Sequence, residues 1–301
     1  MITSGLLYVD KPAGITSHDV VGIVRRAART KRVGHAGTLD PFATGLLVLA
    51  VNGATRLLPY VVGEPKVYDA VIRFGWETDT DDSTGQPGRT APTPAAPVLA
   101  DPVAPSLRDA IAALTGTLAQ RPPAFSAKHV NGERAYALAR RGETVDLPPV
   151  TVRVFGWEWL GSTADTLTVR IQCGGGTYIR ALARDLGRAL GSAAHCDSLR
   201  RVASGPATII DAESLGSLEP GSIADGRVLL RSPLPALGDI AREPLDEAGL
   251  TALRFGRRVP ATIPGVRGAL LRHDEIVAIA ERTGGDWWQP RVVMLGDEGT
   301  S

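Results

Sequence analysis

One glycine-rich stretch of this sequence carries a residue that could do chemistry. Residues 34–47 read GHAGTLDPFATGLL, and their three glycines and one proline predict a loop whose backbone can approach a ligand closely. Asp40 is the only carboxylate between Asp19 and Glu64, so any acid, base or nucleophile chemistry in the loop falls to it. Pro41 biases the backbone of Asp40 toward extended conformations and so fixes how its side chain is presented. The alternative is a tight turn in which Asp40 only caps the next segment.

Composition narrows the class of protein. With 301 residues and 44% hydrophobic content, the chain can bury a full core and has room for a second, smaller domain. No stretch approaches the length of a membrane span, so no membrane contact is expected. The two cysteines, Cys173 and Cys196, form no Cys-x-x-Cys pair and cannot build a disulfide framework. These features predict a cytoplasmic protein.

Charge is distributed unevenly along the chain although the net charge is only +1. Residues 1–60 carry 7 Lys/Arg against 3 Asp/Glu, and residues 106–205 carry 13 against 8. Residues 61–105 and 206–301 are acidic, each with a net charge of −4. Because local clusters of Lys and Arg make phosphate contacts, the two basic segments favour a polyanionic partner. The alternative for each cluster is a solvated helix face.

No metal or nucleotide site is expected. The histidines (His18, His35, His129, His195 and His273) lack the spacing of metal ligands. Three glycines at 174–176 stand between a predicted strand and a predicted helix. They have neither the Lys-Ser/Thr pair of a phosphate-binding loop nor dinucleotide spacing. The sequence therefore predicts neither a metal site nor a nucleotide site.

Hydrophobic periodicity predicts strands and helices in the first 230 residues. Strands are expected at 6–9, 46–51, 66–75, 151–160 and 166–173. Ser17 is the expected N-cap of a helix that ends near Lys31, and Ser106 the expected cap of a helix over 107–114. The acidic stretch 77–85 lacks the spacing of an EF-hand loop and is predicted to be a solvated loop.

The pattern changes around 229–237, where Pro233 and Pro235 indicate a linker. Beyond it, short apolar pieces at 258–260, 269–271, 276–280 and 291–294 predict a small β-rich module. The net charge of −4 over 206–301 argues against direct binding of RNA phosphates by this module.

Several ordered motifs resemble one known family. The string GHAGTLDPFATG at 34–45 resembles the catalytic motif of the TruB family of tRNA pseudouridine synthases, in which the aspartate is the essential residue. Four further strings resemble motifs of the same family: KPAGITS at 11–17, QRPPAFSAKHVNG at 120–132, GGTYIRALARDLG at 175–187 and DSLRR at 197–201. The resemblance covers residues 5–235.

The resemblance implies a role for each matching residue of a uracil pocket. Asp40 would be the catalytic aspartate, and Arg180 would pair with it, favour its ionised form and orient it bidentately. Tyr68 would stack on the flipped uracil, because an extruded base must recover its lost stacking. Tyr178 and Leu199 would line the pocket.

Three further residues would bind the RNA. His35 would lie at the RNA surface and assist base flipping, and Lys11 is the lysine of the N-terminal motif. Lys128 would belong to an inserted thumb, at about 120–150, that pins the RNA stem-loop. The alternative for this region is an ordinary surface hairpin and helix.

The implied fold is α+β, with a central mixed, mainly antiparallel sheet flanked by helices. The catalytic domain would span 1–235 and a PUA-like domain 240–301. The implied function is isomerisation of uridine to pseudouridine at position 55 in the T loop of tRNA. The protein would need no cofactor and no obligatory protein partner, and would act as a monomer.

Two other functions remain open. The first is an RNA chaperone or scaffold that folds tRNA, for which Asp40 would be dispensable. The second is a guide-RNA-dependent synthase of the box H/ACA type, against which the absence of long N-terminal and Lys-rich C-terminal extensions argues.

Overall fold

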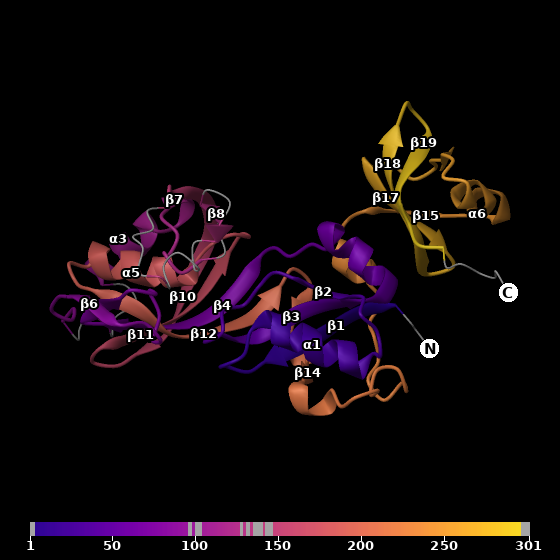
Figure 1. Ribbon diagram of the computed structural model, residues 1–301. Helices are drawn as coiled ribbons and strands as arrows, with labels where there is room; N and C mark the ends of the chain where they lie inside the picture. The colour runs from indigo at the N-terminus through magenta and orange to yellow at the C-terminus, as the bar shows by residue number, and fades with distance from the viewer. Residues whose placement is uncertain are drawn as a thin grey trace.

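The computed structural model describes residues 4–95, 98–99, 104–126, 129–130, 133–134, 141 and 147–295. Two sheets organise this part of the chain, and the smaller one lies at one end of the molecule (Figure 1). The large sheet has ten strands, in the order β14-β1-β3-β12-β4-β11-β10-β7, with β13 beside β12 and β2 beside β3. Among these pairs only β1 with β14 and β3 with β12 are parallel. The predicted mixed, mainly antiparallel sheet is therefore confirmed.

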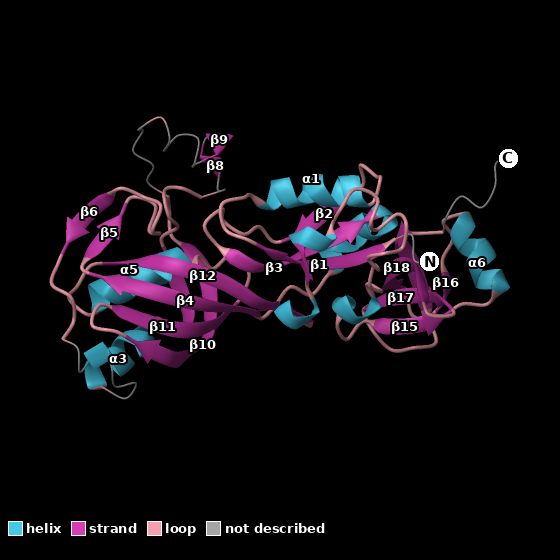
Figure 2. Ribbon diagram, turned by 90° about the horizontal axis from the view of Figure 1, so that it is seen from below, coloured by secondary structure: helices cyan, strands magenta, loops and turns pink. Residues whose placement is uncertain are grey.

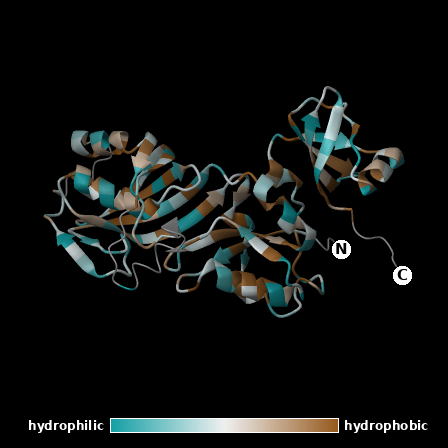
Figure 3. Cartoon of the chain, turned by 45° about the horizontal axis from the view of Figure 1, so that its top comes forward, coloured by the Kyte–Doolittle hydropathy of each residue, from teal (hydrophilic) through white to brown (hydrophobic). Residues whose placement is uncertain are grey.

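The elements of the larger part are β1 (Gly5–Lys11), α1 (Ser17–Ala27), β2 (Val33–Ala36), β3 (Thr44–Val51), a 3-10 helix (Asn52–Tyr60), β4 (Lys66–Phe74), β5 (Trp76–Thr78), β6 (Pro87–Thr90), α3 (Pro105–Ala113), β7 (Gly116–Gln120), β8 (His129–Val130), β9 (Glu133–Arg134), β10 (Val150–Ser162), β11 (Thr166–Cys173), α5 (Ile179–Ala189), β12 (Ala194–Ser204), β13 (Ala207–Thr208) and β14 (Glu213–Ser214). Helices α1 and α5 pack on one hydrophobic core, toward opposite ends of the large sheet (Figure 2). Hydrophobic and hydrophilic residues are interspersed along these elements, as expected where each has one buried face (Figure 3).

Helix α1 begins with a capping box, but the expected N-cap is wrong. Thr16 is the N-cap: its hydroxyl accepts from the amide of Asp19, whose carboxylate accepts from the amide of Thr16. Ser17 is instead buried, and its hydroxyl bonds both the amide and the carbonyl of Leu39, at 2.9 and 3.1 Å. The start of α1 is thereby tied to the residue before Asp40.

Two other predicted helix boundaries also shift. Helix α1 ends at Ala27 and not near Lys31, because Arg29 adopts a left-handed conformation with φ 49°. Helix α3 begins at Pro105, so the expected cap Ser106 lies inside its first turn. Proline suits this position because its missing amide hydrogen would have no helical partner there.

The second sheet contains β15 (Ala241–Pro244), β17 (Arg267–Arg272), β18 (Glu275–Thr283), β19 (Trp287–Val293) and β16 (Val259–Pro260), with α6 (Glu247–Arg254) beside it. Its core surrounds Trp288, whose indole N–H donates to buried Glu243 at 2.9 Å. The β-rich character expected for this region is confirmed.

The stretch 229–237 does not act only as a linker. Arg231 exchanges two backbone hydrogen bonds with Leu6, so this part of the stretch completes the edge of the large sheet. Leu237 packs with Leu57 of the larger part and with Ala269 of the second sheet. A shared apolar cluster therefore joins the two parts.

Among the described residues, no helix is long and apolar enough to span a membrane.

Candidate active site

A cavity opens where the loop after β2 meets strands β4 and β12 and the start of α5. Its lining residues are Gly37, Thr38, Leu39, Asp40, Lys66, Tyr68, Ser126, Gly176, Thr177, Tyr178, Ile179, Arg180, Leu199 and Arg201. Five of the residues predicted from the sequence therefore meet in one place, although they come from four separate segments. Sheet pairing brings β12 beside both β3 and β4, and this pairing assembles the cavity.

The backbone holds Asp40 from both sides. Leu39 is buried and bonded to Ser17, while the carbonyl of Pro41 accepts from the amide of Gly14 at 2.8 Å and from the ammonium of Lys11 at 3.3 Å. The side chain of Asp40 nevertheless remains 39% exposed. A fixed backbone thus presents an accessible carboxylate to the cavity.

Arg180 is the counter-charge of this carboxylate. Its Nε lies 2.9 Å from Oδ2 of Asp40, and its side chain is only 4% exposed. The contact is an ion pair without a well-directed hydrogen bond, so the bidentate orientation expected from the sequence is not present. The other nitrogens donate to the carbonyls of Thr80 and Phe125, at 2.7 and 3.1 Å. These two carbonyls hold the guanidinium in place independently of Asp40.

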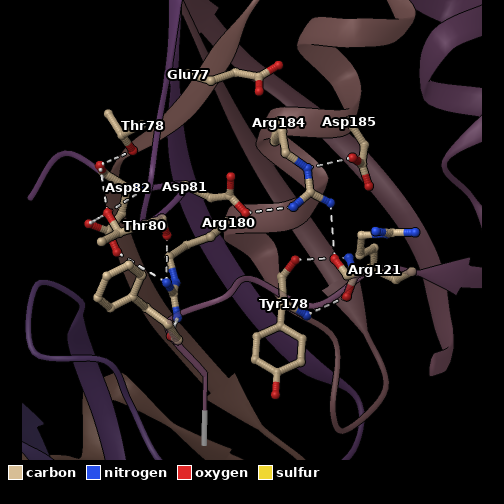
Figure 4. Close-up of polar contacts among 12 residues, drawn as sticks. Glu77, Thr78, Thr80, Asp81, Asp82, Arg121, Tyr178, Arg180, Arg184 and Asp185 are labelled. Atoms are coloured by element: carbon tan, nitrogen blue, oxygen red, sulfur yellow. Dashed lines mark hydrogen bonds and ion pairs between the residues drawn. The ribbon is translucent and has the colours of Figure 1, made fainter. Parts of the chain in front are cut away.

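The structure of the acidic stretch 77–85 differs from its prediction more than that of any other site segment. It is not a solvated loop, because Glu77, Asp81 and Asp82 are buried. Its carboxylates pair with three arginines spaced four residues apart along one face of α5. Figure 4 shows two of these arginines, Arg180 and Arg184. The pairs are Asp82 with Arg180 at 3.4 Å, Asp81 with Arg184 at 2.7 Å and Glu77 with Arg188 at 2.7 Å.

These pairs differ in their electrostatics. Hydrogen bonds from Arg188 lower the pKa of Glu77 despite burial, and Arg89 adds a contact at 2.9 Å. For Asp81, burial dominates and raises the pKa to about 6, although Arg184 opposes the shift. The spacing of Arg180, Arg184 and Arg188 is visible in the sequence, but their acidic partners are not.

The pocket walls are aromatic and aliphatic. Tyr68 on β4 and Leu199 on β12 are both 7% exposed and both line the cavity. Tyr178, the N-cap residue of α5, is held through its backbone by two hydrogen bonds with the side chain of Gln120, at 2.9 and 3.0 Å. A flat apolar group can therefore be enclosed within reach of Asp40.

Two predicted site residues, Lys11 and His35, do not line this cavity. Lys11 is fully buried, and its ammonium donates to the carbonyls of Pro12, Ile15 and Pro41 at 2.9, 2.8 and 3.3 Å. Burial lowers its pKa to about 8.

His35 is half-buried on β2, where burial and then Arg201 lower its pKa. A third predicted site residue, Lys128, lies outside the described residues, as does about half of the proposed thumb at 120–150.

Two charged residues that line the cavity, Arg201 and Lys66, were not predicted to do so. Arg201 is fully buried and donates to the carbonyls of Leu46 and Gly37 at 2.7 and 3.0 Å, which joins β12 to the loop of Asp40. Lys66 begins β4, two residues before Tyr68 and therefore on the same face. That spacing is the only sequence signal for Lys66. Within the described ranges, no group of three or more His, Cys, Asp or Glu is placed to hold a metal ion.

Comparison with known proteins gives a consistent result. The family model described as "TruB family pseudouridylate synthase (N terminal domain)" matches residues 25–179. The tRNA pseudouridine synthase B of Arthrobacter sp. (strain FB24) is 47% identical over 265 residues, which are 86% of this chain and 83% of that protein. The same enzyme of Solibacter usitatus (strain Ellin6076) is 40% identical over 300 residues, or 96% and 99% of the two chains.

Solved structures show the fold. A chain of a Cbf5-Nop10-Gar1 complex superposes with a TM-score of 0.69 at 22% identity, covering 97% of this chain and 85% of the other. A second, from an archaeal Nop10-Cbf5 complex, gives 0.68 at 23% identity over 98% and 87%.

Proposed function

Because the chain belongs to the TruB family of pseudouridylate synthases, we propose that it converts the uridine at position 55, in the T loop of tRNA, to pseudouridine. The observation that carries this proposal is the pair formed by Asp40 and Arg180 beside a pocket walled by Tyr68, Tyr178 and Leu199. The chain is an isomerase acting on tRNA, and the proposal adds the target position and the residues that do the work.

The reaction asks for few groups. The bond between C1′ of the ribose and N1 of uracil breaks, the base turns, and C1′ becomes bonded to C5; the proton on C5 leaves and N1 gains one. Nothing is oxidised or hydrolysed overall. A carboxylate at the junction of base and sugar and an enclosed pocket for the detached base meet these demands. Asp40 supplies the carboxylate, and the two tyrosines and Leu199 supply the pocket.

The target base must leave its stack to reach Asp40. Unstacking costs only a few kcal/mol in a loop, and an aromatic face in the pocket recovers part of it. We assign this role to Tyr68, which is buried on a strand and therefore rigid. Lys11 and Ser17 hold the loop of Asp40 from behind, so we assign Lys11 a positioning role instead of contact with RNA.

The proposal also covers the domains, the RNA contacts and the state in which the protein acts. We assign residues 1–235 to the catalytic domain and 240–301 to a PUA-like domain with its own core. His35 and Lys128 would contact the RNA around the target. The protein would act in the cytoplasm as a monomer, without an obligatory protein partner.

Neither alternative function is favoured. A chaperone would not need an accessible carboxylate paired to a buried arginine. Chains of the two Cbf5 complexes share the fold at 22 and 23% identity, whereas relatives named tRNA pseudouridine synthase B are 40–49% identical. Guide-RNA dependence therefore has no support from sequence similarity.

The proposal is tested with an unmodified tRNA transcript, purified protein and no added metal, nucleotide or guide RNA. We expect pseudouridine at position 55 and none in a transcript with cytidine at that position. Tight binding to the transcript without any pseudouridine would contradict the proposal and favour the chaperone.

Replacement of Tyr68 tests the assigned stacking role. Tyr68→Leu should lower kcat/KM by about 10- to 100-fold, because a lost base–aromatic stack costs about 1–3 kcal/mol. Tyr68→Phe is the matched control, since it keeps the ring and should stay within a few-fold of wild type. Full turnover by Tyr68→Leu would show that Tyr68 does not act by stacking on the uracil.

A further inference from the structure

Two lysines near the active site have opposite surroundings. The ammonium of Lys11 is fully buried and donates to three backbone carbonyls. Lys66 is half-buried, lines the cavity, and forms no hydrogen bond or ion pair with any residue of the described ranges. Basic residues in this chain are mostly arginines, with only four lysines, so a lysine facing the cavity is itself unusual. Lys11 therefore has hydrogen-bond partners among the described residues, and Lys66 has none there.

Three glycines lie around the Lys66 ammonium. A Cβ added at Gly175, Gly63 or Gly37 would lie 3.5, 3.7 or 4.0 Å from Nζ of Lys66. These glycines come from three separate segments: the end of β11, the approach to β4 and the loop of Asp40. Gly37 also has φ +85°, which other residues rarely adopt. Backbone of three segments therefore lies beside the ammonium of a lysine that lines the cavity.

The charges around Lys66 favour an anion. Burial and the neighbouring guanidinium of Arg201 lower the pKa of Lys66, and Glu64 opposes this shift. The carboxylate of Glu64 is directed to the amide of Gly175, at 2.5 Å, and forms no ion pair with Lys66. A half-buried ammonium without a partner is unfavourable until an opposite charge arrives.

We propose that Lys66 binds a phosphodiester oxygen of the RNA next to the flipped uridine. Phosphates are the only permanent negative charges of RNA, and an ammonium is a compact point charge that suits them. Tyr68, on the same strand face, would hold the base while Lys66 holds its backbone. The inference rests on the proposed function, because it takes the RNA in this cavity to be the substrate.

The test compares Lys66→Met, Lys66→Arg and the wild type in binding an unmodified tRNA transcript over a range of salt concentrations. One lost phosphate contact should reduce the slope of log Kd against log salt by about 0.7 and weaken binding by about tenfold at low salt. Lys66→Arg should keep the wild-type slope. Arg108→Gln removes one charge from exposed α3, outside the cavity, and should change neither quantity.

Folding and chemistry are measured on the same variants. Because Lys66 has no partner within the described ranges, Lys66→Met should unfold at a urea concentration no lower than the wild type. At saturating enzyme, the single-turnover rate of Lys66→Met shows whether its loss lies in binding or in the reaction, and Arg108→Gln should keep the wild-type rate.

Two results would overturn the proposal. An unchanged salt slope in Lys66→Met would show that no phosphate is bound there. A lowered single-turnover rate with unchanged affinity would mean that the ammonium acts on the uracil instead. If the wild type binds tRNA but forms no pseudouridine, the proposed function fails, while the salt slope still tests Lys66.

Discussion

Two loops deliver a carboxylate to the same guanidinium, and they do so in opposite ways. The glycine-rich loop at 34–45 presents Asp40, whose side chain is 39% exposed, to Nε of Arg180. The acidic loop at 77–85 presents Asp82, whose side chain is 6% exposed, to Nη1 of the same residue. One carboxylate faces the cavity and the other faces the interior.

The different exposure of the two carboxylates gives them different roles: Asp40 can react, and Asp82 holds Arg180 in place. Asp82 accepts hydrogen bonds from the hydroxyls of Thr80 and Thr84 and from the amide of Thr84, so its oxygens are occupied. Asp40 has only Arg180 as a charged partner among the described residues, which leaves its carboxylate available. An arginine shared between a buried and an accessible carboxylate remains anchored while the accessible one reacts.

Removal of the shared arginine should have the largest effect. Arg180→Met leaves Asp82 buried without its counter-charge, and we expect the free energy of unfolding to fall by about 3–5 kcal/mol. Turnover should fall by about 100-fold or more, because Asp40 loses the group that holds it. Urea denaturation and pseudouridine formation measure the two effects. Wild-type stability in this variant would contradict the anchoring role of the acidic loop.

Asp82→Asn should have a smaller effect on both quantities. Arg180 keeps Asp40 and two backbone carbonyls, so we expect a loss of about 2 kcal/mol in unfolding free energy. Turnover should fall by about tenfold, as expected from a small displacement of the guanidinium. Asp79→Asn is the control in the same loop, since Asp79 is exposed and its replacement can still accept from the amide of Gln86. Equal losses in both variants would assign the effect to the loop and not to the ion pair.

Asp81→Asn should have the smallest effect, visible mainly in its pH dependence. Burial raises the pKa of Asp81 to about 6, so the folded state takes up a proton that the unfolded state does not bind until the pH approaches 4. The wild type should therefore gain about 1 kcal/mol of stability relative to Asp81→Asn between pH 7 and pH 5. Activity at pH 7 should stay within about twofold, because Arg184 does not line the cavity. Parallel stability curves for the two proteins would show that Asp81 titrates normally.

The sequence predicted the residues of the cavity better than the residues that support them. Asp40, Tyr68, Tyr178, Arg180 and Leu199 stand in motifs whose strings are specific, and the structure brings all five to one cavity. The acidic loop was misread because hydrophilic composition predicts solvation unless the partners are known. Those partners lie about 100 residues away on α5, and only the tertiary fold brings them together.

Lys11 and Lys66 show the same limit on a smaller scale. A lysine in a turn after a strand and a lysine before an aromatic residue give no sign of their surroundings in the sequence. Their roles depend on which backbone carbonyls lie near each ammonium, and tertiary packing decides this. Local features were easier to predict: most strand cores were located within a few residues, whereas the caps of α1 and α3 were misplaced by one or two.

We expect Asp40 to be needed for the reaction, and other residues to stabilise the fold and to bind the RNA. The most direct test of this role of Asp40 is pseudouridine formation and binding of one tRNA transcript by wild-type and Asp40→Asn protein. We expect the variant to bind tRNA and to unfold like the wild type, because the side chain is accessible and asparagine nearly keeps its shape. Its turnover should fall by at least about 100-fold. Turnover within tenfold of wild type by a properly folded Asp40→Asn protein would contradict the account.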